Sequence, residues 1–151
     1  MSALQIGTMV MLAFGGVFTG VMVAVAVERV NLWGRMPAEQ YAVDFRRSLY
    51  RFDPMQPILG VVTAIGAVIF ALESSGSPRT LAWVAVALIA LIIVGSIAIA
   101  EPMNSRFRKL PEGDVPAGAE QMRARWKRFH FARTFATVSV LVLLAAAASN
   151  V

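Results

Sequence analysis

The sequence predicts an all-α integral membrane protein folded as a four-helix bundle. Of its 151 residues, 58% are hydrophobic and 15% are charged, whereas soluble domains carry about 25% charged residues. Four stretches contain no Asp, Glu, Lys, Arg or His: Leu4–Val27, Pro54–Leu72, Thr80–Ala100 and Thr134–Val151. Each approaches or exceeds the roughly 20 apolar residues that cross the hydrocarbon layer as a helix. None has the polar face that a soluble amphipathic helix needs.

The membrane helices are expected to span residues 4–28, 54–73, 80–101 and 130–149 of a single membrane domain, residues 1–151. Two long charged loops, residues 29–53 and 102–129, and one plain turn, residues 74–78, connect them. Small residues recur four apart in Gly16-x-x-x-Gly20 of the first helix and in Gly60-x-x-x-Ala64 of the second. Such rows let helix backbones approach closely, so they are predicted packing positions.

Both charged loops are expected to contain local structure. In the first loop, Pro37 suits an initial helical turn, and Tyr41, Phe45 and Leu49 recur at helical spacing, which predicts a short surface helix. The second loop passes Pro102 and a turn-rich stretch, residues 111–116. A basic helix then begins at about Ala119 and runs without a breaker into the fourth membrane helix.

The basic residues predict the orientation. Of the 14 Lys and Arg residues, the first charged loop holds five, the second loop through Arg133 holds eight, and Arg79 alone lies in the short turn. Positive loops favour the cytoplasmic side. We therefore expect a multi-pass protein of the cytoplasmic membrane with charged loops inside and both termini outside. The pI near 10.7 reflects this flanking charge, so anionic lipid is the expected partner and no nucleic acid is expected.

The two halves of the chain resemble each other. Glu28-Arg29-Val30-Asn31 and Glu101-Pro102-Met103-Asn104 each end a membrane helix, and a later basic segment aligns Asp53 with His130. A duplication predicts two helical hairpins related by a pseudo-two-fold axis along the membrane normal. Equivalent residues of the two halves would then meet at the cytoplasmic end. Asp53 before Pro54 also matches a helix N-cap, and capping is its expected role.

Glu28 and Glu101 are candidate catalytic residues. Each lies in the last turn of its helix, at the edge of the hydrocarbon, where an unpaired carboxylate is costly. Asn31 and Asn104 follow three residues later and are candidate substrate ligands. An alternative reading is a salt bridge from each Glu to a nearby arginine.

The only histidine, His130, is a further candidate catalytic residue, and it shares one helix face with Trp126 and Arg133. Trp126 is a candidate substrate contact or an interfacial anchor, and Arg133 a candidate catalytic residue or a second anchor. Placed opposite two carboxylates, His130 could complete a metal site with Glu28 and Glu101, a ligand set that suits Fe, Mn or Zn. An ordinary hydrogen-bonding histidine is the alternative, since the Glu-x-x-His spacing of di-iron proteins is absent. The cofactor is therefore left open, between none and a non-haem metal ion.

Four parts of the chain share a pattern with a known family: Glu28–Asn31, Tyr50–Gln56, Glu101–Asn104 and the face from Trp126 to Arg133. In these parts the chain resembles the anthrone oxygenase-like family of small four-helix membrane proteins. The resemblance covers nearly the whole chain, although His130 stands where that family usually has Asn. It implies an oxidoreductase that converts an anthrone-type polyphenol to a quinone with molecular oxygen. A carboxylate would then act as the base, and Arg133 or Arg51 would stabilise the phenolate.

Two classes of function remain open at this point. In the first, a polar pocket at the cytoplasmic end of the bundle oxidises a flat aromatic or quinone-like molecule. In the second, the same polar residues join the helices of a non-catalytic subunit that binds lipid or a larger membrane complex. Loss of turnover on substitution distinguishes the first class from the second, in which only stability would change.

Overall fold

The computed structural model describes residues 1–151 and contains only helices and their connections. The elements are α1 (Ala3–Ala24), η1 (Val25–Arg29), α2 (Val30–Trp33), α3 (Ala38–Phe52), α4 (Met55–Glu73), α5 (Gly76–Gly95), η2 (Ser96–Ala100), α6 (Glu101–Lys109) and α7 (Ala119–Ser149). They form four continuous or nearly continuous rods, each long and apolar enough to cross a membrane. The predicted four-helix membrane bundle is therefore confirmed, and the chain is a multi-pass membrane protein.

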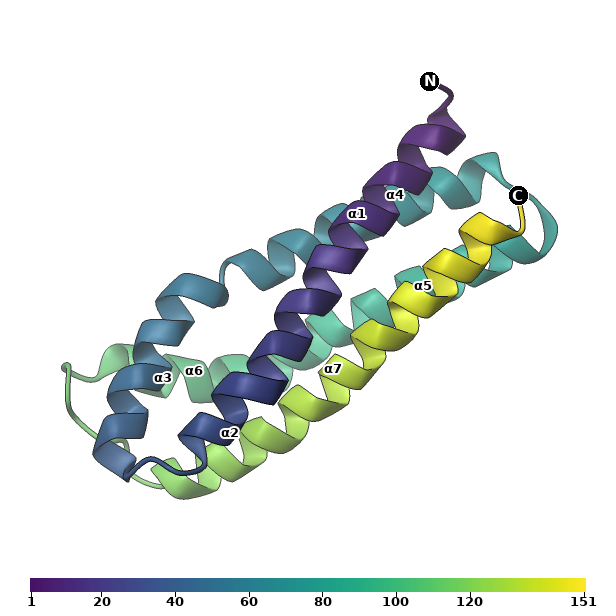
Figure 1. Ribbon diagram of the computed structural model, residues 1–151. Coiled ribbons are helices and arrows are strands. Elements are labelled where there is room, and N and C mark those ends of the chain that lie inside the picture. The colour runs from purple at the N-terminus through teal and green to yellow at the C-terminus, as the bar shows by residue number, and fades with distance from the viewer.

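The four rods close into a bundle in which α1 packs on α4, α4 on α5, α5 on α7 and α7 on α1. Both termini lie at one end, together with the tight connection from α4 to α5 (Figure 1). The opposite end contains α2, α3, α6 and the first turns of α7, and we call it the charged end. Such an up-and-down arrangement follows from antiparallel neighbours joined by short loops.

The predicted charged loops are mostly helical. The surface helix expected after Pro37 is α3, and the basic helix expected from Ala119 is the start of α7, so both predictions are confirmed. The helix expected to end near Glu101 instead continues through Pro102 to Lys109. The turn expected over residues 74–78 is shorter than predicted, because α5 already begins at Gly76.

Pro102 is accommodated by a change of helical pitch. Proline has no N–H and its ring crowds the carbonyl four residues earlier, which normally ends or kinks an α-helix. Here the π-helical segment η2 comes directly before it, and the Glu101 N–H donates to the Ser96 carbonyl, five residues back. The wider turn absorbs one extra residue and leaves room for the ring. The first rod has a matching π-helical segment, η1, in which the Val30 N–H donates to the Val25 carbonyl.

Two apolar clusters stabilise the bundle. Within the membrane-spanning part, the fully buried side chains come from all four rods and include Met11, Phe70, Ile89 and Leu144. At the charged end, aromatic rings pack mostly edge to face: Trp33, Tyr41, Phe45, Phe107 and Trp126. Edge-to-face pairs stabilise a fold by about 0.5–1.5 kcal/mol each beyond their buried area. The charged end is therefore a packed cap on the bundle.

The closest helix approach is not at the small residues that the sequence indicated. A Cβ atom on Gly16 or Gly20 would meet nothing within 4 Å. On Gly66 of α4 it would lie 2.6 Å from the Met11 backbone nitrogen, and on Gly7 of α1 it would lie 2.7 Å from the Phe70 nitrogen. The α1–α4 crossing therefore requires glycine at positions 7 and 66.

We expect Gly66→Ala to destabilise the protein and Gly16→Ala to leave it unchanged or slightly more stable. The first change forces two backbones apart, and overpacking of this kind costs about 1–3 kcal/mol. The second adds a methyl group in open space and removes the helix penalty of glycine, about 1 kcal/mol. Unfolding in detergent micelles measures both. Equal stability of the two variants would contradict the α1–α4 crossing.

The orientation is open to a direct test because the chain has no cysteine. Ser75 lies exposed between α4 and α5, and Asp114 lies exposed in the loop at the charged end. From the positive loops we expect an impermeant maleimide to label Ser75→Cys in intact cells, and Asp114→Cys only after permeabilisation. The opposite pattern would show that the charged end faces outward.

Candidate functional site

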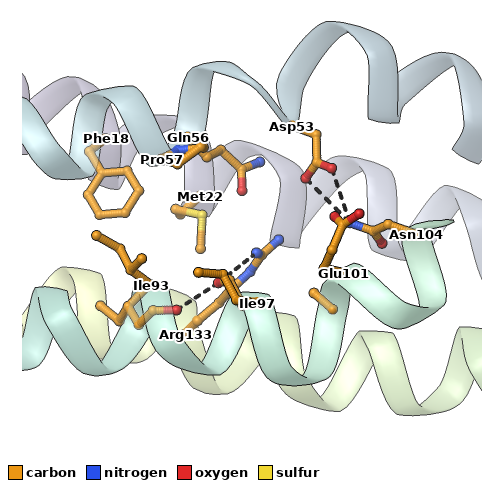
Figure 2. Close-up of a pocket in the computed structure, with 13 residues that line it drawn as sticks. Phe18, Met22, Asp53, Gln56, Pro57, Ile93, Ile97, Glu101, Asn104 and Arg133 are labelled. Carbon is orange, nitrogen blue, oxygen red and sulfur yellow. Dashed lines mark hydrogen bonds between the residues drawn. The ribbon is translucent and has the colours of Figure 1, made fainter.

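A cavity of about 170 Å³ lies where the membrane-spanning part meets the charged end. All four rods contribute to its walls (Figure 2). Its apolar lining includes Phe18, Met22, Pro57, Ile93 and Ile97, and its polar lining consists of Asp53, Gln56, Ser96, Glu101, Asn104 and Arg133. A mostly apolar pocket with a few convergent polar groups is the usual form of a small-molecule site.

Two carboxylates lie at one end of the cavity, held by a single arginine. Arg108 donates to Asp53 Oδ2 at 3.0 Å and forms an ion pair with Glu101. The Ser105 hydroxyl donates to Glu101 Oε1 at 2.7 Å, and Arg108 binds this same oxygen. Glu101 Oε2 has no hydrogen-bond partner within the chain. Glu101 is thus oriented through one oxygen and has the other available for a ligand.

Arg133 supplies a positive charge to the cavity wall. Its guanidinium points toward the cavity (Figure 2), and the residue is 7% exposed. Its hydrogen bonds go to neutral atoms, His130 Nδ1 at 3.1 Å and the Ser96 hydroxyl at 3.5 Å. No carboxylate lies within salt-bridge distance of it. A buried cation without a carboxylate in direct contact is costly, and an anionic or electron-rich ligand oxygen would relieve that cost.

His130 orients Arg133 from behind the cavity. The ring is fully buried and stacks on Trp126, with centroids 4.8 Å apart. Because Nδ1 accepts from Arg133, the network assigns the ring proton to Nε2, which donates to the Met22 carbonyl at 3.2 Å. The Arg133 guanidinium also lies 5.5 Å from the Trp126 ring centroid, a cation–π contact. Both ring nitrogens of His130 are thus engaged within the protein.

Asn104 has an unsatisfied acceptor. The residue is 3% exposed, and its amide nitrogen donates to the Asp53 carboxylate at 3.2 Å. This contact fixes the orientation of the Asn104 amide group, because the flipped amide would place its oxygen against the carboxylate oxygens of Asp53. Oδ1 then has no hydrogen-bond partner, although it is buried. A buried polar atom without a partner costs about 1–3 kcal/mol.

Of the residues that the sequence indicated, Glu101, Asn104 and Arg133 line the cavity together, and Trp126 and His130 lie behind Arg133. The other candidates lie elsewhere. The Glu28 side chain is 66% exposed and pairs with Arg29. Asn31 is exposed and donates to the Val27 carbonyl, and Arg51 is exposed. The cavity therefore contains only one of the two repeated glutamates.

The predicted convergence of Glu28, Glu101 and His130 is wrong. Val25, Ala26 and Val30 occupy the inward face of the first rod at the charged end, and this turns Glu28 outward. The structure contains no group of three His, Cys, Asp or Glu residues placed to hold a metal ion. The three residues present do not fit the metal site that the sequence suggested, and the chemistry below is derived from the cavity residues alone.

The prediction that Asp53 caps a helix is wrong, and no motif in the sequence marks Gln56 or Ser96 as residues of the site. Asp53 has helical backbone angles and makes no capping hydrogen bond to α4. Its carboxylate instead binds Arg108 and Asn104 at the cavity. The signal was its alignment with His130 in the repeat, which placed a second ionisable group at the same level of the bundle.

Comparison with known proteins gives one match. A family model described as anthrone oxygenase matches residues 45–147. The matched region begins within α3 and includes every polar residue that lines the cavity. No curated protein and no solved structure matches the chain.

Proposed function

Since the chain belongs to the anthrone oxygenase family, we propose that it is a membrane oxidoreductase that oxidises a flat aromatic molecule in the cavity between its four rods. The observation that supports this most strongly is the pairing of opposite charges across an apolar space. Arg133 brings an unpaired, buried guanidinium to the cavity, and Glu101 brings a carboxylate oxygen without a partner. Together they suit a substrate that loses a proton and becomes an oxyanion.

Glu101 is the proposed general base. Its Oε2 can accept a proton from the carbon or hydroxyl group of a ring seated in the cavity. Asp53 is less suited, because Arg108 and Asn104 together occupy both of its oxygens. The structural role of Asp53 is to hold Arg108, which in turn orients Glu101.

Arg133 is the proposed oxyanion site. Removing a proton from an anthrone-type ring system moves negative charge onto the carbonyl oxygen. A fixed, buried cation stabilises this charge far more than the same cation in water. His130 and Ser96 hold the guanidinium in place before the substrate arrives, so little reorganisation accompanies the reaction.

The overall reaction balances with dioxygen as the oxidant. The deprotonated ring carbon forms a bond to one oxygen atom of dioxygen, and the peroxide anion takes up the proton that Glu101 accepted. The resulting hydroperoxide loses water. The methylene group thereby becomes a second carbonyl, so that anthrone and dioxygen give anthraquinone and water. The residues of the chain bind the ring, accept the first proton at Glu101 and stabilise the oxyanion at Arg133.

The test is turnover of anthrone by the purified protein in lipid nanodiscs, followed by dioxygen consumption and by mass spectrometry with isotopically heavy dioxygen. We expect consumption of dioxygen and heavy oxygen in the new carbonyl, at a rate above that of empty nanodiscs. A rate equal to the background would contradict the proposal and favour the non-catalytic subunit, whose polar cluster only joins the helices.

A further inference from the structure

Two residues of the cavity wall reach the outer surface of the bundle between α4 and η2, and we call this side of the cavity the mouth. Pro57 of α4 and Ile97 of η2 both line the cavity and are exposed. Ile97 is 64% exposed. Apolar side chains of a membrane-spanning segment are exposed to lipid rather than to water, so a ligand can reach the cavity from the bilayer.

A second hollow continues from this mouth. It is a groove of about 320 Å³ between α4 and α5, and every residue that lines it is hydrophobic. Ile93 lines both the groove and the cavity. The groove is lined on both sides by a small side chain, Ala64 on α4 and Ala90 on α5. These small side chains leave open space between the larger apolar side chains.

The spacing along the two helices shows that the groove and the cavity form one track. On α4, residues four apart run from Pro57 at the mouth through Val61 and Ile65 to Ile69. On α5, Val86, Ala90 and Ile93 follow one another at spacings of four and three residues, and Ile97 of η2 follows four residues later at the mouth. Residues three or four apart share one helix face. The track along α4 is about 18 Å long at 1.5 Å per residue.

The cavity itself has room for one aromatic ring. An apolar cavity of about 150 Å³ holds a benzene molecule, and this cavity measures about 170 Å³. Any larger ligand must extend through the mouth, and the groove is the apolar space that it meets there.

The polar atoms of the cavity indicate which polar groups a bound ring should carry. Arg133 is a buried donor group without an anionic partner, and Glu101 Oε2 is an acceptor without a donor. A ring that carries a hydroxyl group and a second oxygen that accepts hydrogen bonds satisfies both at separate positions. Glu101 can accept the proton of the hydroxyl group when it ionises.

We propose that the chain binds a hydroxylated aromatic ring with a linear apolar tail, such as a hydroquinone lipid, with the ring in the cavity and the tail in the α4–α5 groove. This proposal rests on the proposed function, because the same cavity holds the ring. It adds the tail, the lateral entry and the two ring oxygens. Binding of the tail requires no turnover, so it is tested separately.

The experiment uses the wild-type protein in nanodiscs without dioxygen. The probe is a benzohydroquinone with a decyl tail that ends in a photoreactive diazirine. We expect saturable labelling of the far part of the groove, at Val68, Ile69 or Val86, and competition by the same hydroquinone without the diazirine. A phosphatidylcholine with a diazirine in its acyl chain serves as the bulk-lipid control, which also labels exposed side chains of α7 such as Phe135 and Val142 without saturation.

The matched variants are Ala90→Leu and Ala87→Leu. Ala90 lines the groove, whereas Ala87 is exposed on α5 and does not line it. Ala90→Leu adds three carbon atoms to the groove. It should reduce the saturable labelling by about tenfold or more, since even one methylene in an apolar site changes affinity by about tenfold. Ala87→Leu should leave it unchanged.

The proposal is overturned if labelling spreads evenly over the lipid-facing surface, if the unlabelled hydroquinone does not compete, or if Ala90→Leu labels as the wild type does. Diffuse labelling of a protein that oxidises anthrone would remove only the tail assignment. Saturable labelling of a protein without oxidase activity would remove only the proposed function.

Discussion

Replacing Glu101 with Gln is expected to reduce turnover by about 10²–10⁴-fold, the usual contribution of a general base. The amide keeps the shape of the carboxyl group and can still accept hydrogen bonds from Arg108 and Ser105. What it loses is the capacity to accept a proton from the substrate. Steady-state oxidation of anthrone in nanodiscs measures the effect, and a KM close to that of the wild type would assign it to chemistry rather than binding.

Glu112→Gln is the matched control for this substitution. Glu112 also lies at the charged end and pairs with an arginine, Arg47, but both side chains are exposed. Exposed pairs contribute about 0–1 kcal/mol, so neither activity nor stability should change measurably. If Glu101→Gln retained full turnover, or if it lost activity only in proportion to lost folded protein, the general-base assignment would fail.

Arg133→Met is expected to reduce kcat by about 10²–10³-fold, as does the loss of one oxyanion-stabilising group in other enzymes. Met keeps most of the length of the side chain and its contact with the Trp126 ring, but it has no charge. Because the guanidinium has no carboxylate partner, its removal leaves no other charge unpaired. The buried His130 Nδ1 loses its donor, at a cost of about 1–3 kcal/mol, and this offsets the relief of the buried charge, so the variant should be about as stable as the wild type.

Arg133→Lys separates the charge of this residue from its geometry. Lysine restores a cation but not the planar, multi-donor group that reaches both His130 and Ser96. We expect part of the lost activity to return. A purely structural role predicts another result, in which Arg133→Met melts at a lower temperature and turnover per folded molecule is unchanged.

The architecture could be predicted from the sequence because helix length and charge distribution determine it. The lengths of the uncharged stretches predict the four rods, and the helical spacing of aromatic residues after Pro37 predicts α3. The helices that cross the membrane are apolar on all faces, so periodicity does not reveal which face points inward. This is why Glu28 and Glu101, which look alike in sequence, were assigned to one site although only Glu101 lines the cavity.

Local geometry accounts for the remaining differences. The π-helical segment η2 rotates everything after it relative to a regular helix, and apolar sequences give little sign of such a turn. Asp53 before Pro54 matches an N-cap in sequence, but Asn104 and Arg108 of α6 draw its carboxylate away from α4. The close α1–α4 crossing depends on single glycines on two distant segments, and Gly66 was not part of a recognisable row.

The most direct measurement of the central claim is the visible spectrum of a bound nitrophenol, whose ionised and neutral forms absorb at different wavelengths. The probe is titrated into nanodiscs at a pH at which it is neutral in solution. If Arg133 and Glu101 form an oxyanion site, the wild type will show the spectrum of the phenolate, and Arg133→Met will bind the neutral phenol or none. A neutral-phenol spectrum with the wild-type protein, or a phenolate spectrum that persists in Arg133→Met, would contradict the account.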